Sequence, residues 1–160
     1  MGISQNKTDA DQEFQFSCFY LDETLCGFEI ELIQEINDDL NITKVPLSPD
    51  YIVGIMNLRG QIITVINQSQ KIGLRPSKLT KSSRVIVVKS QNEFIGLLVD
   101  KVADVIKTTK KHISSPPSNI NGVQGRFFKG IVQKKGSDLI ALLNIDSILE
   151  EENQSLEMSR

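Results

Sequence analysis

The side chains that could perform catalysis are few in this sequence, and none lies in a known catalytic pattern. His112 is the only histidine, and it follows Lys110 and Lys111 in a polar stretch, which favours a solvated loop histidine over a catalytic one. No serine occupies a G-x-S-x-G elbow. The segment 54–60 begins and ends with glycine but is followed by Gln61, which excludes a phosphate-binding Walker loop. We therefore expect no enzymatic activity and no catalytic residue.

Candidate metal and redox ligands are equally sparse. The acidic runs at residues 38–39 and 150–152 lack the spacing of a calcium-binding loop. Cys18 and Cys26 are the only cysteines, which is too few for a zinc set or a disulfide framework. We expect both to be buried thiols in strands. The sequence predicts no metal site and no cofactor.

Arg59 is the charged residue with the most clearly defined setting. It lies in the segment 57–60, which we interpret as a tight turn because Gly60 permits a backbone with positive φ. The aliphatic run at 62–66 predicts a following strand that is buried on both faces. An arginine held at the end of such a strand can serve in recognition, and the alternative is a plain hairpin with a solvated arginine. Glu35 could pair with Arg59 and hold its side chain in position.

Apolar residues are expected around these two charges. Ile33 and Ile36 flank Glu35, and the apolar residues that precede Arg59 are Val53, Ile55 and Met56. An apolar patch with fixed charges at its rim is typical of protein recognition. We therefore expect a surface that binds other proteins.

The composition narrows the class of protein further. With 160 residues, of which 39% are hydrophobic, the chain can form one compact domain or two small ones that share a core. A formal net charge of −2 argues against nucleic acid as a partner, and we interpret the basic residues at 78–84 and 107–111 as solubilising. No apolar run approaches the roughly 20 residues needed to cross a bilayer. The polar N-terminus resembles neither a signal nor a transit peptide, so we expect a cytoplasmic protein without direct membrane insertion.

Alternating and β-branched residues predict a mainly β chain. Gly27 suggests a bulge or a close backbone approach in the second strand. Ser48-Pro49 predicts a short helix that ends at Gly54, and Asn144 predicts a final helix to about residue 151. We interpret 68–83 as a connector, 107–126 as a long loop, and 1–12 and 151–160 as a disordered N-terminus and a flexible tail. Strands are expected at residues 14–20 (half-buried), 25–30, 33–36, 62–66, 85–88, 94–99, 102–106, 127–131 and 139–143.

Glycines and short motifs recur between the two halves of the chain. Gly27 precedes the segment 33–36 by six residues, and Gly96 precedes the similar segment 102–105 by six, which is an offset of 69 residues. Each of these segments holds an acid, Glu35 in the first and Asp104 in the second. A second set of matches, at an offset of 76, pairs Gly54 with Gly130, Gly60 with Gly136 and the basic Arg59 with Lys135.

The recurrence predicts two similar units, at about residues 14–70 and 84–150, with about five short strands each. Neither unit can bury much surface alone at this size. We therefore expect an all-β fold of two small five-stranded barrels, packed around one shared hydrophobic core, with short helices at the connections and the C-terminus. The seam between the units would form a groove suited to a partner.

These residues resemble the family of the chemotaxis coupling protein CheW. The match begins with Asn57-Leu58-Arg59-Gly60 before an aliphatic strand, and the segments 33–36, 51–54, 96–100 and 102–105 match in order. The resemblance covers about residues 13–150 and is to the stand-alone coupler. Thr64, Asn67 and Gln68 depart from the family pattern, which often has proline, aspartate and leucine there. The family fold consists of two SH3-like five-stranded barrels, which agrees with the repeat.

The resemblance implies a scaffold without catalysis that couples the cytoplasmic tips of membrane chemoreceptors to a histidine autokinase in receptor arrays. It implies that the receptor lies in the groove between the units and that the regulatory domain of the kinase docks beside the barrels. The candidate receptor-binding residues are Ile33, Glu35, Ile36, Asn57, Arg59 and Val99. The candidate kinase-binding residues are Ile42, Val45, Gly54 and Gly60.

Three other functions remain open at this point. The first is a CheW-like coupler of a pathway that drives pili or gliding instead of swimming. The second is an RNA-binding small barrel, which the acidic balance disfavours. The third is a carrier that holds a small molecule in the groove between the units.

Overall fold

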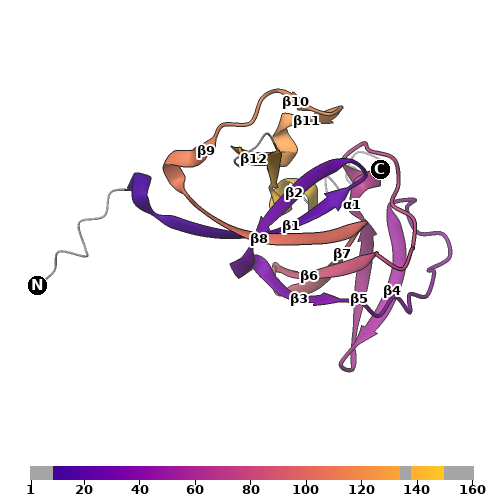
Figure 1. Cartoon of the computed structure of the whole chain (residues 1–160). Helices are drawn as coiled ribbons and strands as arrows, with labels where there is room; N and C mark the ends of the chain where they lie inside the picture. Colours follow the sequence, from indigo (N-terminus) through magenta and orange to yellow (C-terminus); the bar gives the residue numbers. More distant parts are fainter. Residues whose placement is uncertain (1–8, 134–137, 150–160) are drawn as a thin grey trace, which may run out of the picture.

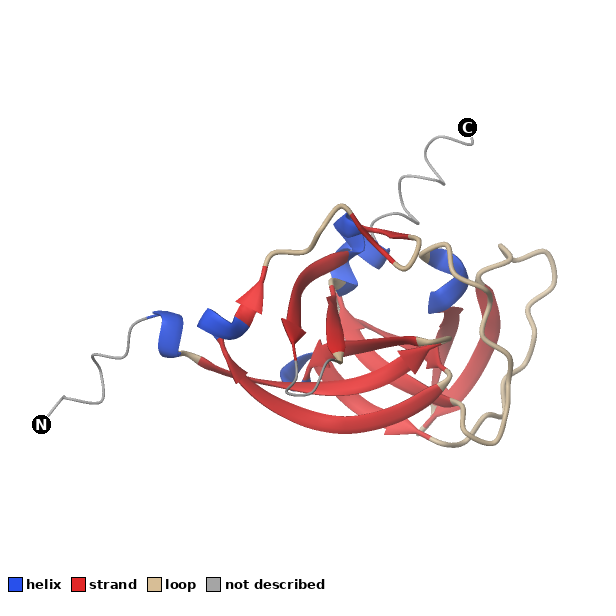
Figure 2. Ribbon diagram, turned by 45° about the horizontal axis from the view of Figure 1, so that its top comes forward, coloured by secondary structure: helices blue, strands red, loops and turns tan. Residues whose placement is uncertain are grey.

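The computed structural model describes residues 9–133 and 138–149, and most of them lie in two curved β-sheets (Figures 1 and 2). The six-stranded sheet has the order β8-β1-β2-β13-β12-β9, and the five-stranded sheet has the order β3-β6-β7-β5-β4. A small hairpin, β10-β11, lies apart from both. These sheets confirm the predicted all-β class.

The elements have the following bounds. In the six-stranded sheet they are β8 Lys101–Thr109, β1 Glu13–Leu21, β2 Thr24–Glu29, β13 Leu139–Leu143, β12 Phe128–Gln133 and β9 Ile113–Ser114. In the five-stranded sheet they are β3 Ile33–Asn37, β6 Arg84–Ser90, β7 Glu93–Val99, β5 Gln61–Asn67 and β4 Ile52–Leu58. The small hairpin joins β10 Asn119–Ile120 to β11 Val123–Gln124. The helical elements are η2 Asp9–Asp11, η3 Ile30–Leu32, α1 Gln68–Lys71, η4 Lys110–His112, η5 Gly125–Phe127 and a helix over residues 145–149.

The two sheets repeat one arrangement of strands. The order β8-β1-β2-β13-β12 of one sheet corresponds, strand by strand, to the order β3-β6-β7-β5-β4 of the other. In this correspondence β1 to β5 of the first half match β6, β7, β8, β12 and β13 of the second half, and β9 is an addition to the six-stranded sheet. Each sheet also contains one parallel pair, β2 with β13 and β5 with β7. Gly27 and Gly96 lie in these parallel pairs, opposite Leu142 and Val65. The recurrence in the sequence is therefore a structural duplication.

The duplicated halves exchange their first hairpins. Strands β1 and β2 lie in the sheet of β8, β12 and β13, whereas β6 and β7 lie in the sheet of β3, β4 and β5. The expected units at 14–70 and 84–150 therefore do not form one sheet each from consecutive strands. Lys135 and Gly136, which the repeat matches to Arg59 and Gly60, lie outside the described residues.

Three apolar clusters hold the sheets together. One lies within the five-stranded sheet around Val65 and Val87, and another within the six-stranded sheet around Phe16 and Leu142. The largest cluster takes residues from both sheets and includes the Phe19 and Phe28 rings, whose centroids are 4.9 Å apart. Each fully buried large apolar side chain contributes about 1.5–3 kcal/mol relative to its exposed state. The shared cluster therefore couples the stability of one sheet to that of the other.

Strand β1 is more buried than its alternating pattern predicts. The prediction of a half-buried strand is wrong, since residues 16–19 are all buried. Phe16 and Cys18 pack within the six-stranded sheet, while Phe19 and Leu21 face the shared cluster. Gly27 forms neither a bulge nor a close approach, because its pairing with Cys18 is in continuous register and an added Cβ would have ordinary contacts at 3.5 Å.

The connecting segments differ from prediction in three places. The short helix expected after Ser48 is absent, because Ser48 donates to the Val45 carbonyl oxygen (2.8 Å) and β4 already begins at Ile52. The connector 68–83 contains α1, whose cap is Asn67. The long loop 107–126 contains η4, β9, β10 and β11.

The ends of the chain were also predicted. The final helix is confirmed over residues 145–149, and Asn144 Oδ1 accepts from the Ser147 N–H (3.1 Å). Of the segment expected to be disordered, Asp9–Asp11 forms η2, and residues 1–8 lie outside the described part of the chain, as does the expected tail 151–160.

Both cysteine thiols should be inert in the folded protein. Cys18 and Cys26 are buried in β1 and β2, as predicted, and they belong to different apolar clusters. Burial raises the pKa of the Cys26 thiol far above its ordinary value, and the nearby Cys18 raises it further. Because the thiolate is the reactive form, we expect Ellman's reagent at pH 8 to label neither thiol in the native protein and both in urea. Native labelling as fast as that of glutathione would contradict this expectation.

Candidate functional site

The β4-β5 hairpin ends in a two-residue turn that presents Arg59. Arg59 (φ 52°) and Gly60 (φ 86°) both have positive φ, which defines a type I′ turn between the paired residues Leu58 and Gln61. The Asn57 side-chain oxygen accepts a hydrogen bond from the Gly60 N–H (2.9 Å). The predicted tight turn and the positive φ at Gly60 are confirmed. The direction of the arginine is therefore set by the backbone of the turn.

An ion pair joins this turn to the opposite edge of the same sheet. Arg59 Nη2 lies 3.1 Å from Glu35 Oε2, as the sequence suggested. β3 and β4 are the two edge strands of the five-stranded sheet, so the pair connects its edges and the sheet must curl strongly. Thr43 and Ile55 exchange two backbone hydrogen bonds of 2.8 Å each, so the chain that follows β3 also closes against the β4 edge.

The ion pair orients Arg59 and adds little stability. The Arg59 side chain is 83% exposed and that of Glu35 is 21% exposed. A pair with one partner so open to water contributes about 0–1 kcal/mol. Most of the Arg59 side-chain surface is free to contact another molecule.

The apolar residues near the charges differ in part from those predicted. Met56 is buried in the five-stranded cluster, and Val53 packs against that cluster. Ile36 is 40% exposed and Ile62 is 63% exposed, so these side chains supply apolar surface on β3 and β5. The prediction that Ile62 is buried is wrong, because it lies two residues from the hairpin tip, opposite Asn57 in the pairing of β4 with β5.

The remaining receptor-binding candidates have different surroundings. Ile33 is partly buried against the shared cluster. Val99 is fully buried in that cluster, so its side chain cannot contact a partner directly.

The kinase-binding candidates lie on β4, on the chain before it and at the hairpin tip that follows it. Ile42 is partly buried in the five-stranded cluster, and Val45 is exposed. Gly54 is buried against the Thr43 backbone, whereas Gly60 lies exposed at the hairpin tip. Sequence reasoning missed Leu47, which is fully exposed and has φ 62°. Its position between two prolines, in Val-Pro-Leu-Ser-Pro, is the signal that could have identified this exposed apolar turn.

Asn57 should stabilise the turn that carries Arg59. Asn57→Ala removes the acceptor of the Gly60 N–H, so we expect the free energy of unfolding to fall by about 1 kcal/mol. Asn57→Asp keeps an acceptor and should retain most of the stability. Urea denaturation of both variants measures the effect, and equal losses in the two would contradict this role for the side-chain oxygen.

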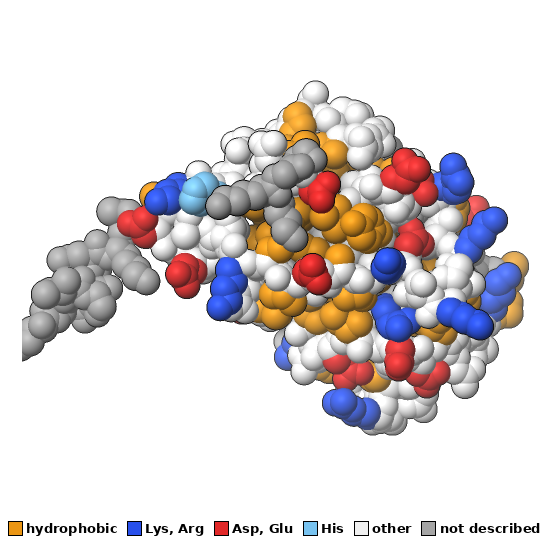
Figure 3. Space-filling model, viewed as in Figure 1, with side chains coloured by type: hydrophobic (Ala, Val, Ile, Leu, Met, Phe, Trp, Pro, Cys, Tyr) orange, Lys and Arg blue, Asp and Glu red, His pale blue; other side chains and the backbone are white. Residues whose placement is uncertain are grey.

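The described surface carries large apolar areas among charged ones. Figure 3 shows apolar side chains gathered over the middle of one face, where β1, β2 and β8 lie, with charged groups of both signs around them. Val105 of β8 is an exposed apolar side chain of the described surface. Within residues 9–133 and 138–149, no group of three or more His, Cys, Asp or Glu side chains could hold a metal ion. No helix in the same ranges is long and apolar enough to span a membrane.

The fold and the site define a class of protein: all-β chains of two duplicated SH3-like subdomains, with an arginine presented at a hairpin tip. A family model described as CheW-like domain matches residues 15–153. The chain belongs to the CheW-like domain family, and this confirms the resemblance found in the sequence.

Named relatives agree with this assignment. The chain is 34% identical over 143 residues to the chemotaxis protein CheW of Thermotoga maritima, covering 89% of this chain and 92% of the relative. It is 31% identical over 136 residues to chemotaxis protein CheW of Treponema pallidum, covering 82% and 80%. The crystal structure of the scaffolding protein TtCheW from Thermoanaerobacter tengcongensis matches with a TM-score of 0.76 and 33% identity, covering 84% of this chain and 86% of that one.

Proposed function

We propose that this protein is a non-catalytic adaptor of chemotaxis signal transduction that couples membrane chemoreceptors to a histidine autokinase. The observation that carries the proposal is Arg59, which is largely exposed at the tip of a type I′ turn and oriented by Glu35 from the opposite sheet edge. A rigid, exposed arginine beside apolar surface is typical of a protein-binding hot spot. Relatives named chemotaxis protein CheW and a neighbour named scaffolding protein support the same function. The protein would act in the cytoplasm, at receptor arrays.

The receptor contact that we propose is centred on the hairpin tip. It comprises Ile33, Glu35, Ile36, Asn57 and Arg59, to which we add the exposed Ile62. Val99 is left out because its side chain is fully buried. The cytoplasmic tip of a receptor, which presents helices, would place apolar side chains on the exposed Ile36 and Ile62 and an acceptor on the Arg59 guanidinium.

The kinase contact that we propose lies on the chain before β4. Val45 is exposed and is joined by Leu47 on the same short turn. Ile42, Gly54 and Gly60 would act by shaping the backbone rather than by touching the regulatory domain of the kinase. Residues 13–150 would form the CheW-like domain, with two subdomains that share strands.

Reconstitution tests the coupling function. Vesicles that carry the chemoreceptor of the source organism are mixed with its chemotaxis kinase, with and without this protein, and then pelleted. We expect the kinase to pellet with the vesicles, and its autophosphorylation to respond to attractant, only when this protein is present. Equal pelleting of the kinase in its absence would contradict the proposal, and Arg75→Glu supplies a control for a surface charge outside both contacts.

A further inference from the structure

Helix α1 and the helix at 145–149 are equivalent elements of the duplicated fold. Val65 and Leu142 lie opposite the glycines of the two parallel strand pairs, and each helix begins three residues after its member of this pair. An asparagine side chain caps each of the two helices. Gln68 of α1 therefore corresponds to Ile145 of the second helix.

The two helices are anchored to the core in different ways. The second helix places three apolar side chains in the shared cluster, those of Ile145, Ile148 and Leu149. α1 has the polar sequence Gln-Ser-Gln-Lys, and Ile72, which follows it, is the residue that enters the cluster. Most of the stability of a short helix comes from the apolar surface that it buries, so α1 should be the weaker of the two.

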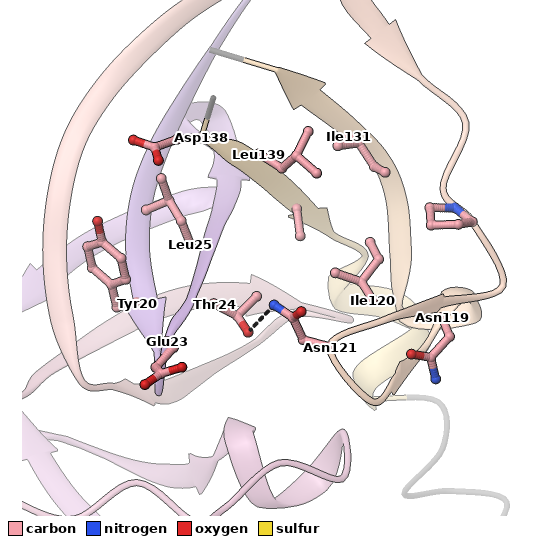
Figure 4. Close-up of a pocket in the computed structure, with 12 residues that line it drawn as sticks. Tyr20, Glu23, Thr24, Leu25, Asn119, Ile120, Asn121, Ile131, Asp138 and Leu139 are labelled. Carbon is pink, nitrogen blue, oxygen red and sulfur yellow. Dashed lines mark hydrogen bonds between the residues drawn. The ribbon is translucent and has the colours of Figure 1, made fainter. Parts of the chain in front are cut away.

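The surroundings of the second helix also hold it in place. The β10-β11 hairpin places Val123 in the shared cluster, and Asn121 Nδ2 in its turn donates to Thr24 Oγ1 of β2 (3.2 Å; Figure 4). The Phe127 carbonyl oxygen, which follows the hairpin, accepts from the Asn144 N–H at the start of the helix (2.8 Å). The second helix is therefore fixed from outside as well as by its own side chains.

Gln68 adds a cost that is specific to α1. Its side chain is fully buried, and neither Oε1 nor Nε2 has a hydrogen-bond partner in the described part of the chain. A buried amide without a partner loses its hydrogen bonds to water and gains none in return. Unwinding of residues 68–72 would return the amide to water. One side chain therefore disfavours the position of α1 seen in the structure, which we call the closed form.

α1 also holds the segment that leads into β4. The Asn67 N–H at the start of α1 donates to the Tyr51 carbonyl oxygen (2.6 Å), and Lys71 Nζ lies 4.8 Å from the centroid of the Tyr51 ring. The Tyr51 side chain packs against the shared cluster, which Ile72 also enters. Tyr51 lies two residues after the exposed turn at 45–49, which is the proposed kinase contact. Movement of α1 would therefore loosen this turn.

We propose that α1 is a latch for the kinase contact, which opens as a local unit and frees the turn at 45–49 when it does. This inference rests on the proposed function, because the turn matters only if a partner binds there. The kinase would bind the closed form and, by the same coupling, would hold α1 closed. The unpartnered amide of Gln68 lowers the free energy of opening, so a modest binding energy is enough to shift the equilibrium.

Hydrogen exchange of the full chain, followed by mass spectrometry of peptides, tests the latch. The Ile72 and Leu74 N–H groups donate to the Gln68 and Ser69 carbonyl oxygens, so their exchange reports the opening of α1. We expect residues 72–74 to exchange at least tenfold faster than residues 147–148 of the second helix, after correction for intrinsic rates.

Gln68→Met removes the amide and keeps the length and unbranched shape of the side chain. It should slow exchange at residues 72–74 about tenfold, because the closed form no longer buries an unpartnered polar group. The Ile52 N–H, which donates to the Pro49 carbonyl oxygen (3.0 Å), should slow by a similar factor, because the turn moves with α1. Residues 147–148 should change by less than twofold.

Gln70→Met is the matched control. Gln70 lies on the same helix but is only half-buried, and methionine has about the same helix propensity as glutamine. This variant should change exchange at residues 72–74 by no more than twofold. The proposal is wrong if Gln68→Met behaves as Gln70→Met does, if it accelerates exchange, or if it slows residues 147–148 as much as residues 72–74.

Addition of the chemotaxis kinase of the source organism tests the link to the turn. At saturation we expect exchange at residues 72–74 to slow at least fivefold and exchange at residues 147–148 to stay the same. If this protein brings the kinase to receptor vesicles but exchange at residues 72–74 does not change, the latch is refuted and the coupling function stands. If the kinase is not brought to the vesicles at all, the coupling function is wrong and the latch falls with it, an outcome that the pelleting assay alone reports.

Discussion

Replacing Gly54 with alanine is expected to lower the free energy of unfolding by about 3 kcal/mol, an effect at the upper end for a single added methyl group. A Cβ at this position would overlap the carbonyl oxygen of Thr43 and would lie 2.8 Å from the Ile42 side chain. Relief would require the segment before β4 to move away from that strand. The two hydrogen bonds between Thr43 and Ile55 would then break, and the five-stranded sheet would lose the contact along its β4 edge.

Gly60→Ala is the matched control for this prediction. Gly60 also has positive φ, but no heavy atom lies within 4 Å of the position of an added Cβ. Alanine at 60 should therefore cost only about 1 kcal/mol, from backbone strain alone. Urea denaturation of both variants measures the difference. Equal losses would mean that the approach of Thr43 to Gly54 does not limit stability.

The same contact explains why Gly54 can influence kinase binding without touching the kinase. Val45 and Leu47 lie on the chain directly after the segment that packs on Gly54. A displaced Thr43 would carry this exposed turn with it. Sequence reasoning named Gly54 as a contact residue, but its buried position supports a role in placing its neighbours.

Local patterns in the sequence were sufficient for most of the strands. Runs of β-branched residues such as 85–88 are buried on both faces and became central strands, because a strand covered on two sides needs apolar residues at every position. The turn at Arg59 and Gly60 was predicted for the same local reason, since glycine adopts positive φ without strain. The ion pair of Glu35 with Arg59 was suggested only by the opposite charges of two separate segments, 33–36 and 57–60.

The pairing of distant strands could not be derived in the same way. The repeat predicted two units, but it carried no information on whether β1-β2 pairs with the first half or the second. Either arrangement buries the same apolar faces, so hydrophobic pattern alone does not choose between them. The exchange of hairpins depends on β2 lying parallel to β13 and β7 parallel to β5, which are contacts between residues far apart in the chain.

Exposure was the least predictable property of the candidate site. Val99 and Ile62 are both aliphatic residues in predicted strands, but one is fully buried and the other is 63% exposed. The difference arises from position along the strand. Val99 ends β7 against the shared cluster, whereas Ile62 is the second residue of β5, near the hairpin tip and beyond the cover of other elements. A sequence shows that a residue is apolar, and the tertiary structure decides whether another element covers it.

Arg59→Glu is expected to weaken binding to the receptor by about 30-fold or more, because buried or half-buried arginine contacts at interfaces are often worth 2 kcal/mol or above. The fold should persist, since the Arg59 side chain is 83% exposed and its pair with Glu35 contributes little to stability. Co-sedimentation with receptor vesicles measures affinity, and urea denaturation of the same samples measures stability. Arg75→Glu makes the same change of charge at another exposed position and should leave affinity unchanged.

The double variant Arg59→Glu with Glu35→Arg separates two roles of the arginine. It restores an ion pair between β3 and the hairpin tip but reverses its direction, so a purely structural role would be rescued. We expect its stability to stay close to that of the parent and its affinity to stay low, because the receptor would meet a carboxylate where it requires a guanidinium. Full recovery of binding in the double variant would show that Arg59 acts only on the hairpin, and the receptor contact would then have to be assigned to Ile36 and Ile62 alone.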